Sequence, residues 1–181
     1  MGCCESRTGS IKPNIYKMIE EYPERTSLKS LPVERISLLN TEIKHERMSK
    51  SDYEKALEKI QLGLPWSLFG SKFYISKRKL IIMLVILSGD EFDVKSAFLR
   101  RFLKNEPREV MYYLEVYYEL VYSKIPHHCT SLHMILSTDK TNIQIQSRCR
   151  LGHLILSSYK SMKGNLENIP TDLLRIKAEV L

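Results

Sequence analysis

The fold is decided by the stretch KRKLIIMLVILSG, which occupies residues 77–89. Its uninterrupted apolar run from Leu80 to Leu87 predicts a mostly buried helix over Lys77 to Ser88, and Gly89 closes that helix. The run is far shorter than the roughly 20 apolar residues that a helix needs to cross a bilayer. We therefore expect this stretch to form the centre of a helical core, and we expect no segment to span a membrane.

Amphipathic helical patterns precede this central stretch. Pro32 suits the start of a helix, and the apolar stripe expected on that helix consists of Val33, Ile36, Leu38, Leu39 and Ile43. The sequence Ser51-Asp52-Tyr53-Glu54 has the arrangement of a capping box. It predicts a second helix that continues through Ile60. A further short helical pattern lies at Asn14 to Glu21.

Helical patterns also follow the central stretch. Asp93 to Leu103 predicts a helix, and its inward-facing residues are expected to be Val94, Ala97, Phe98 and Phe102. After a break at Pro107, Val110 to Ser123 predicts a Tyr-rich helix with apolar residues on more than one face, so we expect it to have two neighbours.

The C-terminal third combines helices with one short strand. Thr130 is expected to cap a helix through His133, Met134 and Leu136, whereas the alternation from Ile143 to Gln146 predicts a very short strand. A helix follows from Ser147 to Met162, Gly164 and Asn165 close it, and Thr171 caps a last helix. The sequence therefore predicts an all-α protein, organised as an acylated tether at residues 1–13, a helical body at 14–163 and a C-terminal helix at 164–181.

The first residues carry a lipidation signal. In Met1-Gly2-Cys3-Cys4-Glu5-Ser6, Gly2 and Ser6 match the requirement for N-myristoylation. One myristoyl chain anchors a protein only marginally, and Cys3 and Cys4 supply the second signal as palmitoylation sites. Two adjacent cysteines at the start of a chain also make little sense as a disulfide framework. We expect a lipid-anchored protein at the cytoplasmic face of a membrane, with the acyl chains seated in lipid or in a protein partner.

A recurring pattern of a polar loop, one β-type apolar residue and a helix suggests a family. The apolar anchors are Met48, Ile75, Met111 and Ile145, and the first two are each followed by Ser-Lys. Their intervals suit helix-loop-helix units with a loop of about 12 residues, except that the first is too short for a full unit. Over roughly residues 33–163 the layout resembles the EF-hand superfamily, in particular its acylated calcineurin-B and neuronal-calcium-sensor branch. The resemblance implies paired loops that touch through a one-residue strand.

The same loops lack the oxygen ligands that calcium needs. The best-matched one, from Lys104 to Glu115, begins with a cation and keeps only its final glutamate, and the first loop, from Thr41 to Asp52, has no glycine. We expect no metal and no cofactor. Loops that bind no calcium cannot drive a calcium-dependent conformational change, and this implies a constitutive, calcium-independent adaptor.

Other functional classes are disfavoured. Cys129 with His133, and Cys149 with His153, stand four residues apart on expected helices, but the pattern matches no known zinc finger. No Gly-rich phosphate loop, nucleophile elbow or metalloprotease helix is present, so we predict no catalytic residues and no small-molecule substrate. The net charge of +7 is spread along the chain; the clusters 77–79 and 100–101 accompany no nucleic-acid-binding motif, so no nucleic-acid partner is expected.

The Tyr-rich helix supplies the candidate partner site. Tyr113 and Tyr117 either line a groove for an amphipathic partner helix or pack in the core, and the sequence favours neither alternative. The leading hypothesis is a dual-acylated, membrane-anchored adaptor that binds a protein partner through a helical groove. The alternative is a structural subunit of a large membrane-associated or cytoskeletal assembly.

Overall fold

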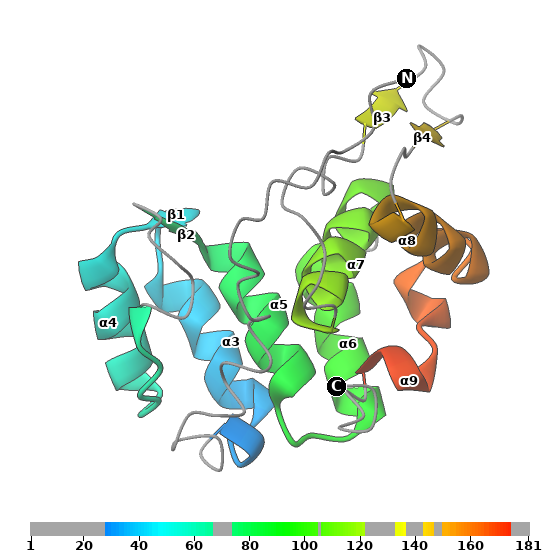
Figure 1. Cartoon of the computed structure of the whole chain (residues 1–181). Helices are drawn as coiled ribbons and strands as arrows, with labels where there is room; N and C mark the ends of the chain where they lie inside the picture. The colour runs from blue at the N-terminus through cyan, green and yellow to red at the C-terminus, as the bar shows by residue number, and fades with distance from the viewer. Residues whose placement is uncertain are drawn as a thin grey trace, which may run out of the picture.

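The computed structural model describes residues 28–66, 74–104, 106–121, 133–136, 143–146 and 150–174. This part of the chain is mostly helical (Figure 1). Its helices and strands, in chain order, are α3 (Val33–Glu42), β1 (Arg47–Met48), α4 (Lys50–Lys59), β2 (Ile75–Ser76), α5 (Lys77–Leu87), α6 (Phe92–Leu103), α7 (Pro107–Val121), β3 (His133–Leu136), β4 (Ile143–Gln146), α8 (Arg150–Ser161), the 3-10 turn η3 (Leu166–Asn168) and α9 (Thr171–Leu174). None of the described helices is both long and apolar enough to cross a bilayer.

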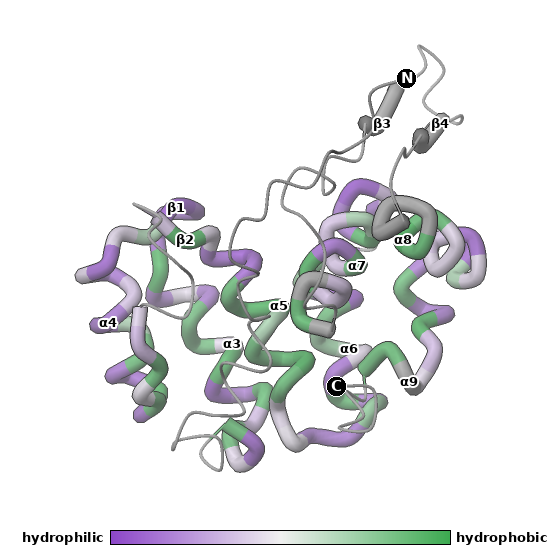
Figure 2. The backbone as a smooth tube through the Cα atoms, viewed as in Figure 1, coloured by the Kyte–Doolittle hydropathy of each residue, from purple (hydrophilic) through white to green (hydrophobic). Residues whose placement is uncertain are grey.

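Helix α5 is the centre of the core, as the sequence predicts. Every residue from Leu80 to Ile86 is buried, and α5 packs against α3, α6 and α7. Figure 2 shows that the start of α5 is hydrophilic and that the rest of the helix is hydrophobic. Ser76 caps the helix by accepting a hydrogen bond from the Lys79 amide. At the other end, a Cβ on Gly89 would lie 2.0 Å from the Lys29 carbonyl oxygen, so only glycine fits this close backbone approach.

Helix α3 begins after Pro32 as predicted, but its cap comes from elsewhere. Pro32 has no side chain that can cap, and instead Asp90, in the α5–α6 connection, accepts a 2.6 Å hydrogen bond from the Val33 amide. Ile36 and Leu39 are buried as expected. Leu38 is 53% exposed, so its place in the predicted apolar stripe is wrong.

Helix α4 begins earlier than its predicted capping box. Ser49 accepts a hydrogen bond from the Asp52 amide while the Asp52 carboxylate accepts from the Ser49 amide, so the box starts at Ser49 and not at Ser51. The reason is the strand before it: β1 pairs with β2, with Met48 opposite Ile75, and this pairing fixes where the chain turns into the helix.

Helix α6 forms over the predicted range, and its buried face matches the prediction in part. Phe98 is buried and Phe102 is partly buried against the core, whereas Val94 is 40% exposed and Ala97 is also exposed, so the prediction is wrong at Val94 and Ala97. Its buried residues include Lys95, whose ammonium donates to the carbonyl oxygens of Ile86 at 3.1 Å and Leu174 at 3.5 Å. The face of α6 that packs against α5, η3 and α9 therefore contains a lysine that donates hydrogen bonds to carbonyl oxygens of α5 and α9.

Helix α7 starts at Pro107, which opens the helix where the sequence indicated only a break. It packs against α5 and α8, so the prediction of two neighbours is confirmed.

The C-terminal third departs from prediction at one element. His133–Leu136 forms strand β3 instead of the predicted helix, because it pairs antiparallel with the predicted strand β4. Helix α8 lies inside the predicted range. Gly164 has the left-handed φ of 66° that a helix-closing glycine takes. The expected helix at Asn14 to Glu21 lies outside the described residues.

Candidate functional site

The predicted lipidation residues Gly2, Cys3 and Cys4 lie outside the described part of the chain. Their assignment therefore still depends on the sequence motif.

The predicted partner-binding residues Tyr113 and Tyr117 lie in the core. Tyr113 is 0% exposed and Tyr117 is 8% exposed, with their ring centroids 6.4 Å apart. The Tyr113 hydroxyl donates a buried hydrogen bond to the Leu173 carbonyl oxygen at 3.3 Å, which ties α7 to α9. Of the two alternatives that the sequence leaves open, this burial favours core packing, and neither ring is available to line an open groove.

The loop anchors divide into two groups. Met48 and Ile75 face each other in the β1–β2 pair, so the first two loops touch. Met111 is a buried residue inside α7, so the predicted loop from Lys104 to Glu115 is wrong: most of it is helix. Ile145 lies in β4 opposite Met134 and not opposite Met111. Only the first half of the described chain therefore has the expected loop contact.

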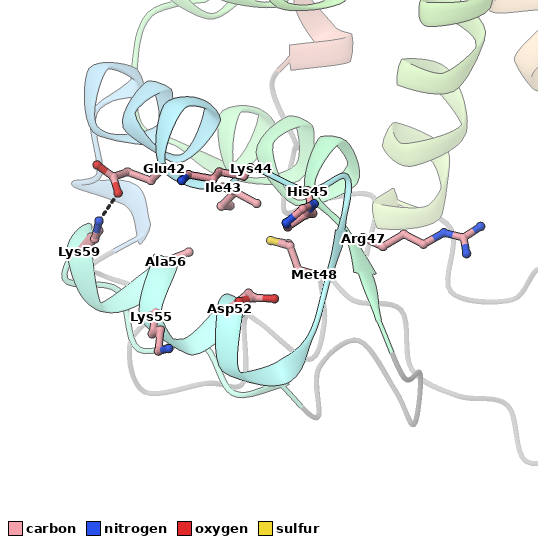
Figure 3. Close-up of a pocket in the computed structure, with 10 residues that line it drawn as sticks. All are labelled: Glu42, Ile43, Lys44, His45, Arg47, Met48, Asp52, Lys55, Ala56 and Lys59. Carbon is pink, nitrogen blue, oxygen red and sulfur yellow. Dashed lines mark hydrogen bonds and ion pairs between the residues drawn. The ribbon is translucent and has the colours of Figure 1, made fainter.

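A pocket of about 340 Å³ opens beside this contact, between the end of α3, the following loop and α4 (Figure 3). Its apolar lining is formed by Ile43, Met48 and Ala56. Its charged and ionisable lining residues are Glu42, Lys44, His45, Arg47, Asp52, Lys55 and Lys59.

The two carboxylates of this pocket already have partners. Glu42 pairs with Lys59 across the pocket. Hydrogen bonds from Ser49 lower the pKa of Asp52 below its usual value, with smaller contributions from the charges of Lys55 and His45. Both acids are thus occupied by groups of the chain itself.

A second polar cluster joins the two touching loops to α7. The Glu46 carboxylate accepts hydrogen bonds from the Ser76 hydroxyl at 2.6 Å and the Arg78 amide at 3.2 Å. The Ser76 hydroxyl also lies 3.0 Å from the Tyr112 hydroxyl, and Arg78 forms an ion pair with Glu109. A carboxylate at the N-terminus of α5 compensates part of the positive end of that helix. This cluster therefore holds the start of α5 against the first loop and α7.

Lys77, the first residue of α5, completes this junction at the end of α3. The Lys77 ammonium donates to the carbonyl oxygens of Asn40 at 3.1 Å and Ile43 at 2.8 Å. A cation at this position satisfies carbonyls that the last turn of α3 leaves unpaired.

Sequence reasoning missed two polar contacts, those of the buried Lys95 and of the partly buried Asp90. Burial lowers the pKa of Lys95 below its usual value, and the charges of Asp90 and Glu91 oppose that shift. Lys95 lies on a helix between apolar residues, and nothing in that local pattern indicates that carbonyls of two other segments meet it.

Within the described ranges, no group of three or more His, Cys, Asp or Glu side chains is placed to hold a metal ion. Cys129 and Cys149, considered above as ligands, lie outside these ranges, and His133 is on a strand and not on the expected helix. The chain matches no family model, no curated protein and no solved structure.

Proposed function

We propose that this chain is a dual-acylated, membrane-anchored adaptor that works without calcium and binds a protein partner through its helical body. The observation that carries the proposal is the sequence Met1-Gly2-Cys3-Cys4-Glu5-Ser6, which combines a myristoylation site with two adjacent thiols. Two lipid signals give stable attachment where one gives only transient attachment.

Calcium independence is supported by how the first helix-loop-helix unit is held. Its α3–β1–α4 arrangement, with the loop contact between Met48 and Ile75, is the part of the chain that still resembles an EF-hand. Glu42 is paired with Lys59 and Asp52 is bound to Ser49, so calcium would have to displace both partners. The fold of this unit therefore needs no ion, and the partner surface is proposed to be permanently formed.

The proposed partner surface differs from the one that the sequence suggested. Because Tyr113 and Tyr117 are buried, the partner contacts other side chains of the body. The exposed large apolar residues of the described chain are Leu38, Tyr74 and Val94, at 53%, 48% and 40% exposure. Single exposed apolar residues are common on proteins, so these three do not define a groove.

The test of the anchor is membrane fractionation of the full chain in cells, combined with mass spectrometry of its N-terminal peptide. We expect a myristoylated Gly2 and thioester-linked acyl groups on Cys3 or Cys4. The Cys3→Ser, Cys4→Ser double variant should retain the myristoyl group and attach only transiently. Stable attachment of that variant, or an unmodified N-terminus on the membrane-bound protein, would overturn dual acylation.

The alternative, a structural subunit with its acyl chains buried in protein, gives a different result in the same assay. A Gly2→Ala variant of the adaptor should move to the soluble fraction. A Gly2→Ala variant that stays in a salt-resistant assembly would favour the structural subunit.

A further inference from the structure

Two basic clusters that are far apart in the sequence meet at one end of the helical core. We call this the basic end, and its members are residues 77–79, Arg100, Arg101, Lys104 and Arg108. Helices α5 and α6 pack together and are joined by the short connection 88–91, so the last turn of α6 returns toward the start of α5 (Figure 1). The ion pair between Arg78 and Glu109 then fixes the start of α5 beside the start of α7.

The opposite end of the same helices has the opposite charge. Asp90, Glu91 and Asp93 lie in the α5–α6 connection and the first turn of α6. At 1.5 Å per residue, a helix with the 11 residues of α5 separates the two ends by about 16 Å. This distance exceeds the Debye length of roughly 8 Å at physiological ionic strength, so a charged surface can interact with one end and not the other.

Four cations of the basic end, at the starts of α5 and α7, oppose local helix stability. Lys77, Arg78 and Lys79 occupy the first turn of α5, which has no acidic residue, and Arg108 lies in the first turn of α7. The positive end of a helix dipole disfavours cations there. Glu46 and Glu109 offset part of this cost. Residues that break a local stability rule are often retained for function.

Several cations of the basic end are available to bind an external partner. Lys77 donates to carbonyls of α3, and Arg78 pairs with Glu109, so these two are engaged inside the protein. Arg101, Lys104 and Arg108 are exposed, and within the described residues none of the three forms an ion pair. Arg101 lies in the last turn of α6, Lys104 directly follows that helix, and Arg108 lies in the first turn of α7.

We propose that the basic end docks onto the anionic lipids of a membrane surface, so that the helical body has a defined orientation there. This inference rests on the proposed function, because the acyl chains of Gly2, Cys3 and Cys4 bring the body to such a surface. Anionic lipid is the occupant that this anchor supplies at high local concentration. Acyl chains and a basic surface together form the kind of two-signal attachment that makes membrane binding stable.

The test uses the unacylated full chain, so that the basic end is measured without the anchor. Sedimentation with vesicles should show binding to phosphatidylcholine mixed with phosphatidylserine and not to phosphatidylcholine alone. Each basic residue near an anionic surface contributes a factor of about five in partitioning. The Arg101→Glu, Arg108→Glu variant should therefore bind at least about 25-fold more weakly. Binding of the unchanged chain should also disappear at about 1 M salt, where the Debye length falls to about 3 Å.

The variants are matched for charge and fold. Glu in place of Arg108 is favoured by the N-terminal dipole of α7, whereas Glu in place of Arg101 is disfavoured at the end of α6, so the two effects on stability oppose each other. The control, Lys29→Glu with Lys160→Glu, changes the net charge equally at exposed residues outside the basic end, and Lys29 lies beside Gly89 at the acidic end. The single variant Arg108→Glu should fold normally, and its binding to the anionic vesicles should still be weaker by about fivefold or more.

Two results would overturn the proposal. One is equal loss of vesicle binding in the control and the basic-end variants, which would mean that net charge alone matters. The other is stronger binding of the unchanged chain to a duplex oligonucleotide than to the anionic vesicles at matched salt, which would assign the basic end to nucleic acid. Failure of acylation itself would leave this vesicle assay unaffected, because the chain in it carries no lipid.

Discussion

Replacing Tyr113 decides whether the Tyr-rich helix belongs to the core or to a binding surface. Tyr113 is 0% exposed, lies beside Tyr117 and donates its hydroxyl hydrogen bond to the Leu173 carbonyl oxygen. Truncation of a buried aromatic residue to alanine costs about 3 to 5 kcal/mol, because burial is lost and a cavity remains. We therefore expect Tyr113→Ala to lower the free energy of unfolding by about 3 to 5 kcal/mol.

A second substitution separates the ring from its hydroxyl. Tyr113→Phe keeps the buried ring and leaves the Leu173 carbonyl without this donor, so we expect a loss of about 1 to 3 kcal/mol. The control is Leu38→Ala on α3, where a side chain that is 53% exposed should change stability by only about 0.5 kcal/mol. The order of stability should therefore be Leu38→Ala, then Tyr113→Phe, then Tyr113→Ala.

Urea unfolding followed by circular dichroism measures all three variants. The slope of unfolding free energy against urea should stay constant, so that a shift of the midpoint reports stability alone. For a chain of this size, the loss expected for Tyr113→Ala lowers the thermal midpoint by roughly 6 to 20 °C. If Tyr113→Ala unfolds at the same urea concentration as Leu38→Ala, the ring is not part of the core and the groove becomes the better explanation.

Three further substitutions test the junctions around α5 and α6. Gly89→Ala should lower the free energy of unfolding by about 1 to 3 kcal/mol, since its Cβ would overlap the Lys29 carbonyl oxygen; an unchanged urea midpoint would contradict this close approach. Asp90→Ala removes the cap on the Val33 amide and should cost about 1 kcal/mol in the same assay, whereas a neutral effect would show that water replaces the cap. Burial lowers the pKa of Lys95 below 10.5, so between its folded pKa and 10.5 the unfolded chain binds more protons and stability rises with pH. The unfolding free energy of the unchanged chain should therefore rise relative to that of Lys95→Met as pH increases toward 10.5, and a constant difference would refute this titration.

The sequence predicts elements whose signal is local. Helix α5 follows from its apolar run, and the strand β4 follows from the alternation Ile143 to Gln146. The closing turn at Gly164 needs only a residue that tolerates positive φ. Met48 and Ile75 each stand immediately before a helix in two similar short patterns, and they pair with each other.

The elements that the sequence predicts incorrectly depend on partners from distant segments. On α6, residue type favours Val94 and Ala97 as inward residues, yet Lys95 is buried because the carbonyls of Ile86 and Leu174 meet its ammonium. Those acceptors are the ends of two other segments, so no pattern within α6 can reveal them. The strand β3 is a different case, because its partner β4 is the next strand along the chain, with Leu136 opposite Ile143.

The residues of the candidate site also divide into those with a local sequence signal and those that depend on tertiary contacts. The lipidation motif is local and can be found from Gly2, Cys3 and Cys4 alone. A tyrosine on a helix with two apolar faces has no local sign of which face is covered, and for Tyr113 the covering partner includes Leu173, 60 residues away in the chain. Exposure of an aromatic residue on such a helix is thus decided by tertiary packing and not by the helix itself.

The first helix-loop-helix unit, α3–β1–α4, pairs its carboxylates with groups of the same chain. Loop carboxylates brought close together repel one another unless a cation or hydrogen-bond donors neutralise them. Here Glu42 has the ammonium of Lys59, and Glu46 has the Ser76 hydroxyl and the Arg78 amide. Lys77 supplies a cation at the carbonyl end of α3. These carboxylates are thus paired within the chain itself. If the unit binds no ion, as we propose, no free energy of ion binding is available to move α3 relative to α4, and we expect one constant conformation of this unit.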